Sequence, residues 1–240
     1  MQRNLQIPLY LPIVFQSHKM VAEIVILLLC AYLIGSASTA ILLCKAFYRQ
    51  DIRLSGSGNP GANNVQRMYG WKMGITVLLI DALKGLLAVN MVYITSIDPN
   101  SELFATLQLL LGLFVMLGHI FPIFFKFKGG KGVAILFGIM GAMHPWAMMI
   151  CVGIFLIILL ITRYISLSVL IAVLFYPIMI NSLFALWITP NETLTVKVFS
   201  IVTCVIIWLS HISNIKRIIN HTEEKFRIKK PVSRSVANRR

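Results

Sequence analysis

The sequence predicts an all-α integral membrane protein with about seven transmembrane helices, an outward N-terminus and a cytoplasmic C-terminus. The composition indicates this class, because 58% of the 240 residues are hydrophobic, only 12% are charged, and the mean hydropathy is +0.83. A soluble domain has about half apolar and a quarter charged residues, and disordered, collagen-like or small disulfide-bonded chains differ even more. Long apolar stretches, and an uneven distribution of lysine and arginine between them, are the other two observations.

One of these apolar stretches, 133–161, is too long for a single upright helix at about 1.5 Å per residue. It contains His144-Pro145, and proline is disfavoured in a helix interior. We therefore expect two short helices there, which gives seven spans in all. The expected spans are 21–44, 73–95, 103–125, 133–143, 146–161, 165–189 and 196–212.

The lysines and arginines orient these spans, because cytoplasmic segments of membrane proteins carry an excess of them. If the first span runs inward, eighteen of the 22 fall on or beside the cytoplasmic face. They lie in segments 45–72 and 126–132, at Arg163, and in segment 213–240. This asymmetry predicts a multi-pass membrane protein with an outward N-terminus and with segments 45–72, 126–132 and 213–240 facing the cytoplasm.

We expect three regions: an N-terminal extension 1–20, one membrane domain 21–215, and a basic cytoplasmic tail 216–240. The extension lacks the small-residue cleavage site of a signal peptide, and Met1 and Met20 are both candidate starts. The net charge of +14 between apolar spans favours anionic lipid headgroups or anionic substrates, and not nucleic acid, as partners. The four cysteines lie in or beside apolar spans without CxxC spacing, so we expect neither disulfides nor a metal site.

The first cytoplasmic loop, residues 51–67, is rich in glycine and in hydrogen-bonding side chains. Its glycines match the spacing GxGxxG, but a membrane helix precedes them instead of a strand, so we exclude a dinucleotide-binding fold. Glycine still lets backbone N–H groups approach an anion, and Arg67 offers a bidentate fork for phosphate. Further donors are Ser57, Asn59, Asn63 and Asn64. The loop is a candidate phosphate site; the alternative is a flexible polar turn.

The second loop, Lys126–Gly132, combines three lysines with three glycines directly before a helix expected to begin at Val133. Backbone donors, the helix dipole and ammonium groups together suit a phosphate. The candidate residues are Lys128, Gly129, Gly130 and Lys131. The alternative is the ordinary positive charge of a cytoplasmic face, which would need lysines but not glycines.

Two pairs of polar residues stand at helical spacing. His211 and Asn214 are i,i+3 and share one face of the last helix, so they are candidates for proton transfer or, alternatively, a satisfied interfacial pair. Asp81 and Lys84 are also i,i+3, but they lie deep in the second span, where ionisable groups need partners. We expect them to form a structural ion pair.

Three cytoplasmic segments thus present anion-binding or proton-transfer groups at one membrane face. This convergence predicts an enzyme that acts on phosphate-bearing substrates at the inner leaflet. A transporter or flippase for an anionic solute is the alternative, and the basic residues with the Asp81–Lys84 pair would suit it. The sequence has no repeated halves, however, and its motifs gather at one face instead of the midplane.

Taken together, the motifs resemble the PlsY-type glycerol-3-phosphate acyltransferases of bacterial inner membranes over residues 24–226. The motifs that carry the resemblance are Gly35-Ser36, S-G-S-G-N-x-G-A-x-N-x-x-R ending at Arg67, Asp81-x-x-Lys84-Gly85, Gly118-His119-Ile120-Phe121-Pro122, K-F-K-G-G-K-G-V-A from Lys126 to Ala134, H-x-x-N-I-x-R from His211 to Arg217, and Thr222-Glu223.

The resemblance implies a seven-helix fold with a cytoplasmic active site. It implies transfer of a fatty acyl group from acyl phosphate to the 1-hydroxyl of sn-glycerol 3-phosphate, giving lysophosphatidate and phosphate. The implied partners are both substrates, the lipid bilayer and an acyl-phosphate-producing enzyme, and no cofactor is expected. The family's substrate-handling positions match Ser57, Arg67, Lys128, Ser166, His211 and Asn214.

Combining residue types with the resemblance, we expect Ser57, His211 and Asn214 to be catalytic. The expected substrate-binding residues are Arg67, Asn59, Asn63, Lys128, Gly129, Gly130, Lys131 and Ser166. The base is either His211 or a phosphate of the substrate. Acyltransferases that use thioesters commonly carry H-x-x-x-x-D, and none of the five histidines has Asp at that spacing.

The chain also departs from the family pattern at four positions. The family usually has Pro at Ser38, Thr at Asn63 and at Ile135, and Gly at His221. These differences are typical of a divergent paralogue, and they concern rate and donor preference more than the class of reaction.

Overall fold

The structure is a computed structural model that describes residues 10–182 and 193–226. Within these residues it contains α-helices and short 3₁₀ turns and no strand, so the all-α class is confirmed. The longest helices are α1 (Tyr10–Ser36), α4 (Trp71–Asn90, continued by η2, Met91–Ile94), α5 (Glu102–Ile120) and α7 (Pro145–Thr162). The other helices are α2 (Thr39–Tyr48), η1 (Ile52–Leu54), α3 (Ala62–Tyr69), η3 (Ile123–Phe125), α6 (Val133–Met143), α8 (Ile165–Asn181), α10 (Leu194–Ser210) and α11 (Ile212–Ile219).

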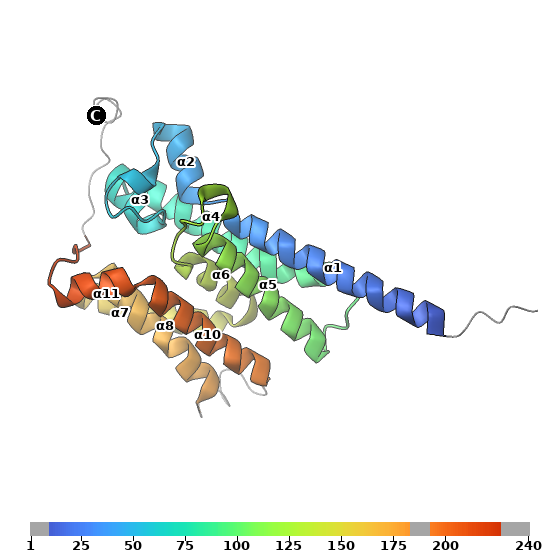
Figure 1. Ribbon diagram of the computed structural model, residues 1–240. Helices are drawn as coiled ribbons and strands as arrows, with labels where there is room; N and C mark the ends of the chain where they lie inside the picture. Colours follow the sequence, from blue (N-terminus) through green and yellow to red (C-terminus); the bar gives the residue numbers. More distant parts are fainter. Residues whose placement is uncertain (1–9, 183–192, 227–240) are drawn as a thin grey trace, which may run out of the picture.

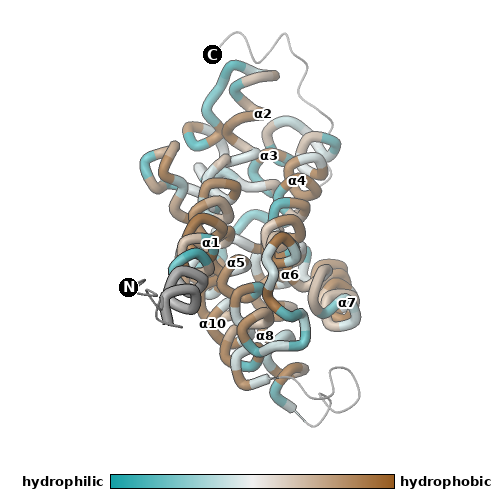
Figure 2. The backbone as a smooth tube through the Cα atoms, turned by 90° about the vertical axis from the view of Figure 1, so that its right-hand side faces the viewer, coloured by the Kyte–Doolittle hydropathy of each residue, from teal (hydrophilic) through white to brown (hydrophobic). Residues whose placement is uncertain are grey.

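The helices pack in two neighbouring groups. In one, α1 packs on α5 and α4 packs on α6; in the other, α8 packs between α7 and α10 (Figure 1). Figure 2 shows hydrophobic residues along the helices of both groups and hydrophilic ones gathered near α2 and α3. Four helical segments are long and apolar enough to cross a membrane, and the bent pair α10–α11 counts as a fifth. The chain is therefore a multi-pass membrane protein.

The side chains that face away from the protein support this assignment. On α7, Leu160 and Ile161 are 79% and 74% exposed. Large apolar residues on α1, α4 and α10 are exposed as well. A soluble protein rarely leaves so much contiguous apolar surface uncovered, so these helices have their outer faces in lipid.

Two helix crossings bring backbones unusually close. A Cβ on Gly35 of α1 would lie 2.1 Å from the Val115 carbonyl oxygen of α5. A Cβ on Gly138 of α6 would lie 1.8 Å from the Ala82 carbonyl oxygen of α4. Small residues at such crossings allow the close packing that holds membrane helices together.

The expected division of the long apolar stretch is confirmed. Helix α6 ends at Met143 and α7 begins at Pro145, which is the first residue of the helix. Proline is favourable there because the first N–H of a helix has no intrahelical partner.

One other expected span needs correction. The stretch 21–44 is not one helix, because α1 ends at Ser36 and α2 begins at Thr39. The Lys84 ammonium group of α4 donates to the freed carbonyl oxygen of Ala37, which stabilises the break. The stretch 103–125 is confirmed by the candidate span Glu102–Phe125, within which α5 stops at Ile120 and η3 follows. The stretch 196–212 matches α10, after which the chain bends by 57° into α11. Of the stretch 165–189, α8 covers residues up to Asn181, and 183–189 lie outside the described residues.

Helices cross both expected bounds of the membrane domain, residues 21 and 215. Helix α1 begins at Tyr10, within the expected extension 1–20. Helix α11 continues past residue 215, and residues 220–226 then fold back towards α8. The first part of the basic tail therefore belongs with the functional site.

Candidate functional site

Segments far apart in the sequence meet at the end of the molecule that carries α3 and α11, which we call the polar end. Four contacts join them: Arg53 Nη1 donates to the Phe125 carbonyl oxygen (2.8 Å), Arg67 pairs with Glu224, Lys131 donates to Asn214, and the Phe226 N–H donates to the Arg163 carbonyl oxygen (2.6 Å). Described residues in or next to the segments 45–72, 126–132 and 213–226, together with Arg163, are therefore held together at the polar end.

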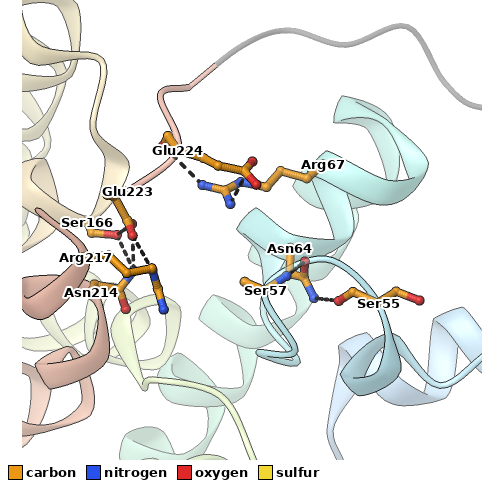
Figure 3. A network of polar contacts seen from close by, with 9 residues as sticks. All are labelled: Ser55, Ser57, Asn64, Arg67, Ser166, Asn214, Arg217, Glu223 and Glu224. Atoms are coloured by element: carbon orange, nitrogen blue, oxygen red, sulfur yellow. Dashed lines mark hydrogen bonds and ion pairs between the residues drawn. The ribbon is translucent and has the colours of Figure 1, made fainter. Parts of the chain in front are cut away.

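Asn214 of α11 lies at the centre of a buried polar network (Figure 3). Its Nδ2 donates to Ser166 Oγ at 2.6 Å and to Glu223 Oε1 at 2.8 Å, and its Oδ1 accepts from the Lys131 ammonium group. Ser166, in the first turn of α8, donates to the same Glu223 oxygen at 2.5 Å. The fold thus brings together three predicted site residues that are 35 or more positions apart in pairs.

Glu223 completes this network, although it was not among the expected site residues. Burial raises the pKa of its carboxyl group, but hydrogen bonds from Ser166, Arg217 and Asn214 favour the charged form more, so the pKa is lowered overall. Arg217 Nε donates to Glu223 Oε2 at 2.7 Å. The site therefore holds a buried carboxylate together with its counter-ion.

Lys131 is the cation nearest to the centre of the network. Burial lowers the pKa of its ammonium group to about 8; the charges of Arg217 and Arg67 act in the same direction, and Glu223 opposes them. The charge of Lys131 consequently changes close to physiological pH.

Beside the network is an open cleft of about 470 Å³. Its lining residues are Asn63, Gln66, Arg67, Tyr164, His221, Glu223, Glu224, Lys225 and Phe226. The Arg67 side chain is only 18% exposed, whereas that of its partner Glu224 is 68% exposed. Arg67 Nη1 lies 3.2 Å from Glu224 Oε2, and Nη2 donates to the Glu224 carbonyl oxygen at 3.3 Å. A largely covered arginine is thus paired with a carboxylate that remains mostly in solvent.

The first loop is ordered by Asn64, which was expected only as an additional donor. Asn64 Oδ1 accepts from the Ser57 N–H at 3.0 Å, and Nδ2 donates to the carbonyl oxygens of Ser55 and Ile52 at 2.9 and 3.2 Å. Ser57 itself is exposed, and Asn59 is partly exposed. Figure 3 shows Ser57 and Asn64 apart from the Asn214 network, and Arg67 above them beside Glu224.

The second loop does not use its glycines as expected. The N–H groups of Gly129 and Gly130 donate to the carbonyl oxygens of Ile120 and His119 at 3.1 Å each. They therefore cap α5 in this structure, and a phosphate would have to take its hydrogen bonds elsewhere. Lys128 is exposed.

His211 is buried where α10 turns into α11. Its Nδ1 lies 2.8 Å from the Ile207 carbonyl oxygen, so Nδ1 carries the proton and Nε2 keeps the lone pair. Asp81 and Lys84 form the expected ion pair, with Lys84 Nζ 3.2 Å from Asp81 Oδ1. His211, Asp81 and Lys84 do not line the cleft.

Three of the departures from the family pattern have a visible structural setting. His221 has φ of 56° in the turn after α11, a left-handed conformation that favours glycine. Asn63, at the rim of the cleft, has a buried Oδ1 without a hydrogen-bond partner among the described residues. Ile135 is buried in the core, where a hydroxyl would need its own partner.

Sequence reasoning missed Arg217, Glu223, Glu224 and Tyr164 as site residues. Glu223 and Glu224 did carry a signal, because they are adjacent carboxylates within a strongly basic segment. No group of three or more potential metal-ligating side chains occurs in the described ranges 10–182 and 193–226.

Residues 25–221 match the family model described as glycerol-3-phosphate acyltransferase. The glycerol-3-phosphate acyltransferase of Shewanella sp. strain ANA-3 is 38% identical over 208 residues, which cover 85% of this chain and 94% of that protein. The enzyme of that name from Enterococcus faecalis is 40% identical over 207 residues, covering 85% and 92%.

Two solved structures share the fold. The glycerol 3-phosphate form of PlsY, an integral membrane glycerol 3-phosphate acyltransferase, matches with a TM-score of 0.75 and 33% identity over 85% of this chain and 96% of that chain. Its lysophosphatidic acid form matches with a TM-score of 0.73 and 32% identity over 86% and 96%.

Proposed function

This chain belongs to the glycerol-3-phosphate acyltransferase family, and from that premise we propose that it transfers a fatty acyl group from acyl phosphate to the 1-hydroxyl of sn-glycerol 3-phosphate. The products are lysophosphatidate and inorganic phosphate. The observation that carries the proposal is the buried Lys131–Asn214–Ser166–Glu223 network beside a cleft that contains Arg67. The alternative of a transporter gains no support, because the relatives are named as acyltransferases.

The charges of the cleft suit phosphate-bearing substrates. Arg67 and Lys225 line the cleft and supply positive charge, to which Lys131 and Arg217 of the adjoining network add, while Glu223 and Glu224 are the carboxylates that line it. Because Glu224 is largely in solvent, its bond to Arg67 is weak. A phosphate dianion can therefore replace it on the guanidinium fork, which suits phosphate geometry.

The reaction needs little activation of the acyl donor, because acyl phosphate is a mixed anhydride. The 1-hydroxyl oxygen forms a bond to the acyl carbon, the bond from that carbon to the phosphate oxygen breaks, and phosphate leaves with the bonding electrons. The main task of the protein is to hold two anionic substrates together in the reactive orientation. Arg67 and Lys131 bind phosphate, and Asn214 joins Lys131 to the Ser166 hydroxyl.

The hydroxyl proton passes to a base, for which two groups fit. His211 Nε2 has a lone pair, since Nδ1 faces the Ile207 carbonyl oxygen. A substrate phosphate is the other. Both polar groups of the Asn214 amide already bind Lys131, Ser166 and Glu223, so Asn214 acts by positioning them.

The proposed topology has seven membrane-crossing segments, an outward N-terminus and the site on the cytoplasmic face of the bacterial inner membrane. The contacts between the lysine- and arginine-rich segments support it, because they place the residues that mark a cytoplasmic face at one end of the molecule. A donor supplied from the cytoplasm would come from an acyl-phosphate-producing enzyme.

The test is product formation by purified protein in lipid nanodiscs. With glycerol 3-phosphate, palmitoyl phosphate should give lysophosphatidate, whereas palmitoyl-CoA and palmitoyl-ACP should not. Inorganic phosphate should inhibit by product competition. Comparable steady-state rates with palmitoyl-CoA, free of acyl phosphate, would overturn the donor assignment, and no product from any donor would overturn the proposed reaction.

A further inference from the structure

A buried polar cluster lies below the second loop, and the reaction described above does not use it. It consists of Thr39, Asp81, Lys84 and His119. Asp81 Oδ1 accepts from Thr39 Oγ1 at 2.5 Å and from Lys84 Nζ at 3.2 Å, and the His119 imidazole Nδ1 lies 3.9 Å away. His119 is 5% exposed and belongs to the last turn of α5.

The other side of the His119 ring supports the second loop. If Gly130 had a Cβ, it would lie 2.2 Å from His119 Nε2, and the three nearest atoms would all belong to the imidazole. The Gly130 N–H also donates to the His119 carbonyl oxygen at 3.1 Å. The φ of Gly130 is outside the left-handed region, so space alone requires glycine here.

The neighbouring Gly129 has a different surrounding. Its hypothetical Cβ would lie 2.0 Å from the His119 backbone oxygen, 2.5 Å from Pro122 Cδ and 2.7 Å from the Ile120 backbone oxygen. None of these atoms belongs to the His119 side chain, so the two adjacent glycines form a matched pair. The His119 imidazole constrains Gly130, whereas backbone atoms and Pro122 constrain Gly129.

The position of Gly130 determines that of the next residue. Lys131 donates to Asn214 Oδ1, and its carbonyl oxygen accepts from Ser210 Oγ at 3.2 Å. If a Cβ at residue 130 pushed the second loop away from α5, the Lys131 ammonium group would therefore move away from the Asn214 network.

We propose that His119 is a positioning residue for acyl transfer: its imidazole, packed between Asp81 and Gly130, sets the height of the second loop above α5 and thereby places Lys131 against Asn214. The catalytic consequence rests on the proposed function, whereas the placement of Lys131 does not. The two parts are therefore tested by separate measurements on the full chain in nanodiscs.

The variants are Gly130→Ala, Gly129→Ala, His119→Asn, and each glycine variant combined with His119→Asn. Asparagine keeps a polar group next to Asp81 but lacks the outer ring atoms that meet Gly130. We expect Gly130→Ala to lower kcat/KM for glycerol 3-phosphate by roughly 100-fold, as a displacement of about 1 Å can do. Adding His119→Asn to Gly130→Ala should raise kcat/KM again by at least about tenfold. Adding it to Gly129→Ala should not raise kcat/KM.

The second measurement needs no activity. Acetylation of Lys131 across a pH series, followed by mass spectrometry of its peptide, should give a midpoint near a pKa of about 8 in the wild type. The charged neighbours that influence it are Arg217, Glu223 and Arg67. The midpoint should rise in Gly130→Ala, because Lys131 becomes more hydrated, and should return in the double variant.

The results discriminate between the two claims. An unchanged Lys131 midpoint in Gly130→Ala, or equal rescue of both glycine variants, would overturn the role of His119. If wild-type protein forms no lysophosphatidate, the proposed function fails, and the labelling series still decides whether His119 places Lys131. If Gly130→Ala cannot be purified folded, recovery of folded protein by His119→Asn for that variant alone supports the contact, and no recovery contradicts it.

Discussion

The Arg67–Glu224 pair predicts opposite effects of two substitutions: Arg67→Ala should weaken substrate binding, and Glu224→Gln should strengthen it. The Arg67 side chain is 18% exposed and lines the cleft, and its guanidinium is paired with Glu224. Arg67→Ala removes a charge-assisted, two-point contact with phosphate, which is worth about 2–3 kcal/mol and corresponds to roughly 30- to 150-fold in kcat/KM. Arg67→Lys should recover little, because the planar fork is lost.

Glu224→Gln should instead improve binding. The carboxylate competes with substrate for Arg67, but it is 68% exposed, so the pair contributes only about 0.2–1 kcal/mol. Removing it should lower the KM for glycerol 3-phosphate by at most about fivefold. Glu102→Gln is a matched control, since Glu102 is exposed at the start of α5 and lies outside the cleft.

The assay is lysophosphatidate formation from palmitoyl phosphate in nanodiscs, with glycerol 3-phosphate varied. Monodisperse elution of each variant should be checked first. Wild-type kinetics for correctly folded Arg67→Ala would refute phosphate binding by Arg67, and a raised KM for Glu224→Gln would refute the competition between Glu224 and substrate.

Three further predictions concern pH, stability and topology. Since the pKa of Lys131 is lowered to about 8, its charge is present below that pH and is lost above it. The kcat/KM for glycerol 3-phosphate should therefore fall as pH rises through 8, and Lys131→Gln should lack this inflection. An inflection that persists in Lys131→Gln would belong to another group. Because His221 has φ of 56°, His221→Gly should stabilise the fold by about 0.5–1 kcal/mol, seen as a higher thermal midpoint in the same detergent, and an unchanged midpoint would show no strain there. Single cysteines at Ser57 should resist an impermeant maleimide in intact cells, and those at Asn100 should react; the reverse pattern would invert the topology.

Much of the fold could be predicted, because its signals are local. Apolar length and charge asymmetry lie along the sequence, and the break at His144-Pro145 follows from proline chemistry. The break after Ser36 could not be predicted in the same way. It depends on Lys84 reaching the Ala37 carbonyl oxygen, and these residues are 47 positions apart.

The site shows the same limit. Lys131, Ser166 and Asn214 were found from residue type and family motif, and the fold joins them. The glycines of the second loop were interpreted as phosphate donors, but their N–H groups cap α5, because the chain turns back over its C-terminus. Glu223 was not among the predicted site residues. Its place in the site depends on hydrogen bonds from Ser166, Asn214 and Arg217, which only the tertiary structure brings together.

The most direct test of the account is a structure of this chain with glycerol 3-phosphate bound. We expect its phosphate in the cleft, within about 3.2 Å of the Arg67 guanidinium, with Glu224 displaced and Lys131 still held by Asn214. The 1-hydroxyl should point towards Glu223, the lining residue that joins the cleft to Ser166 and Asn214. A phosphate bound away from Arg67, with the Arg67–Glu224 pair intact, would contradict the central claim that this cleft is where the acyl group is transferred.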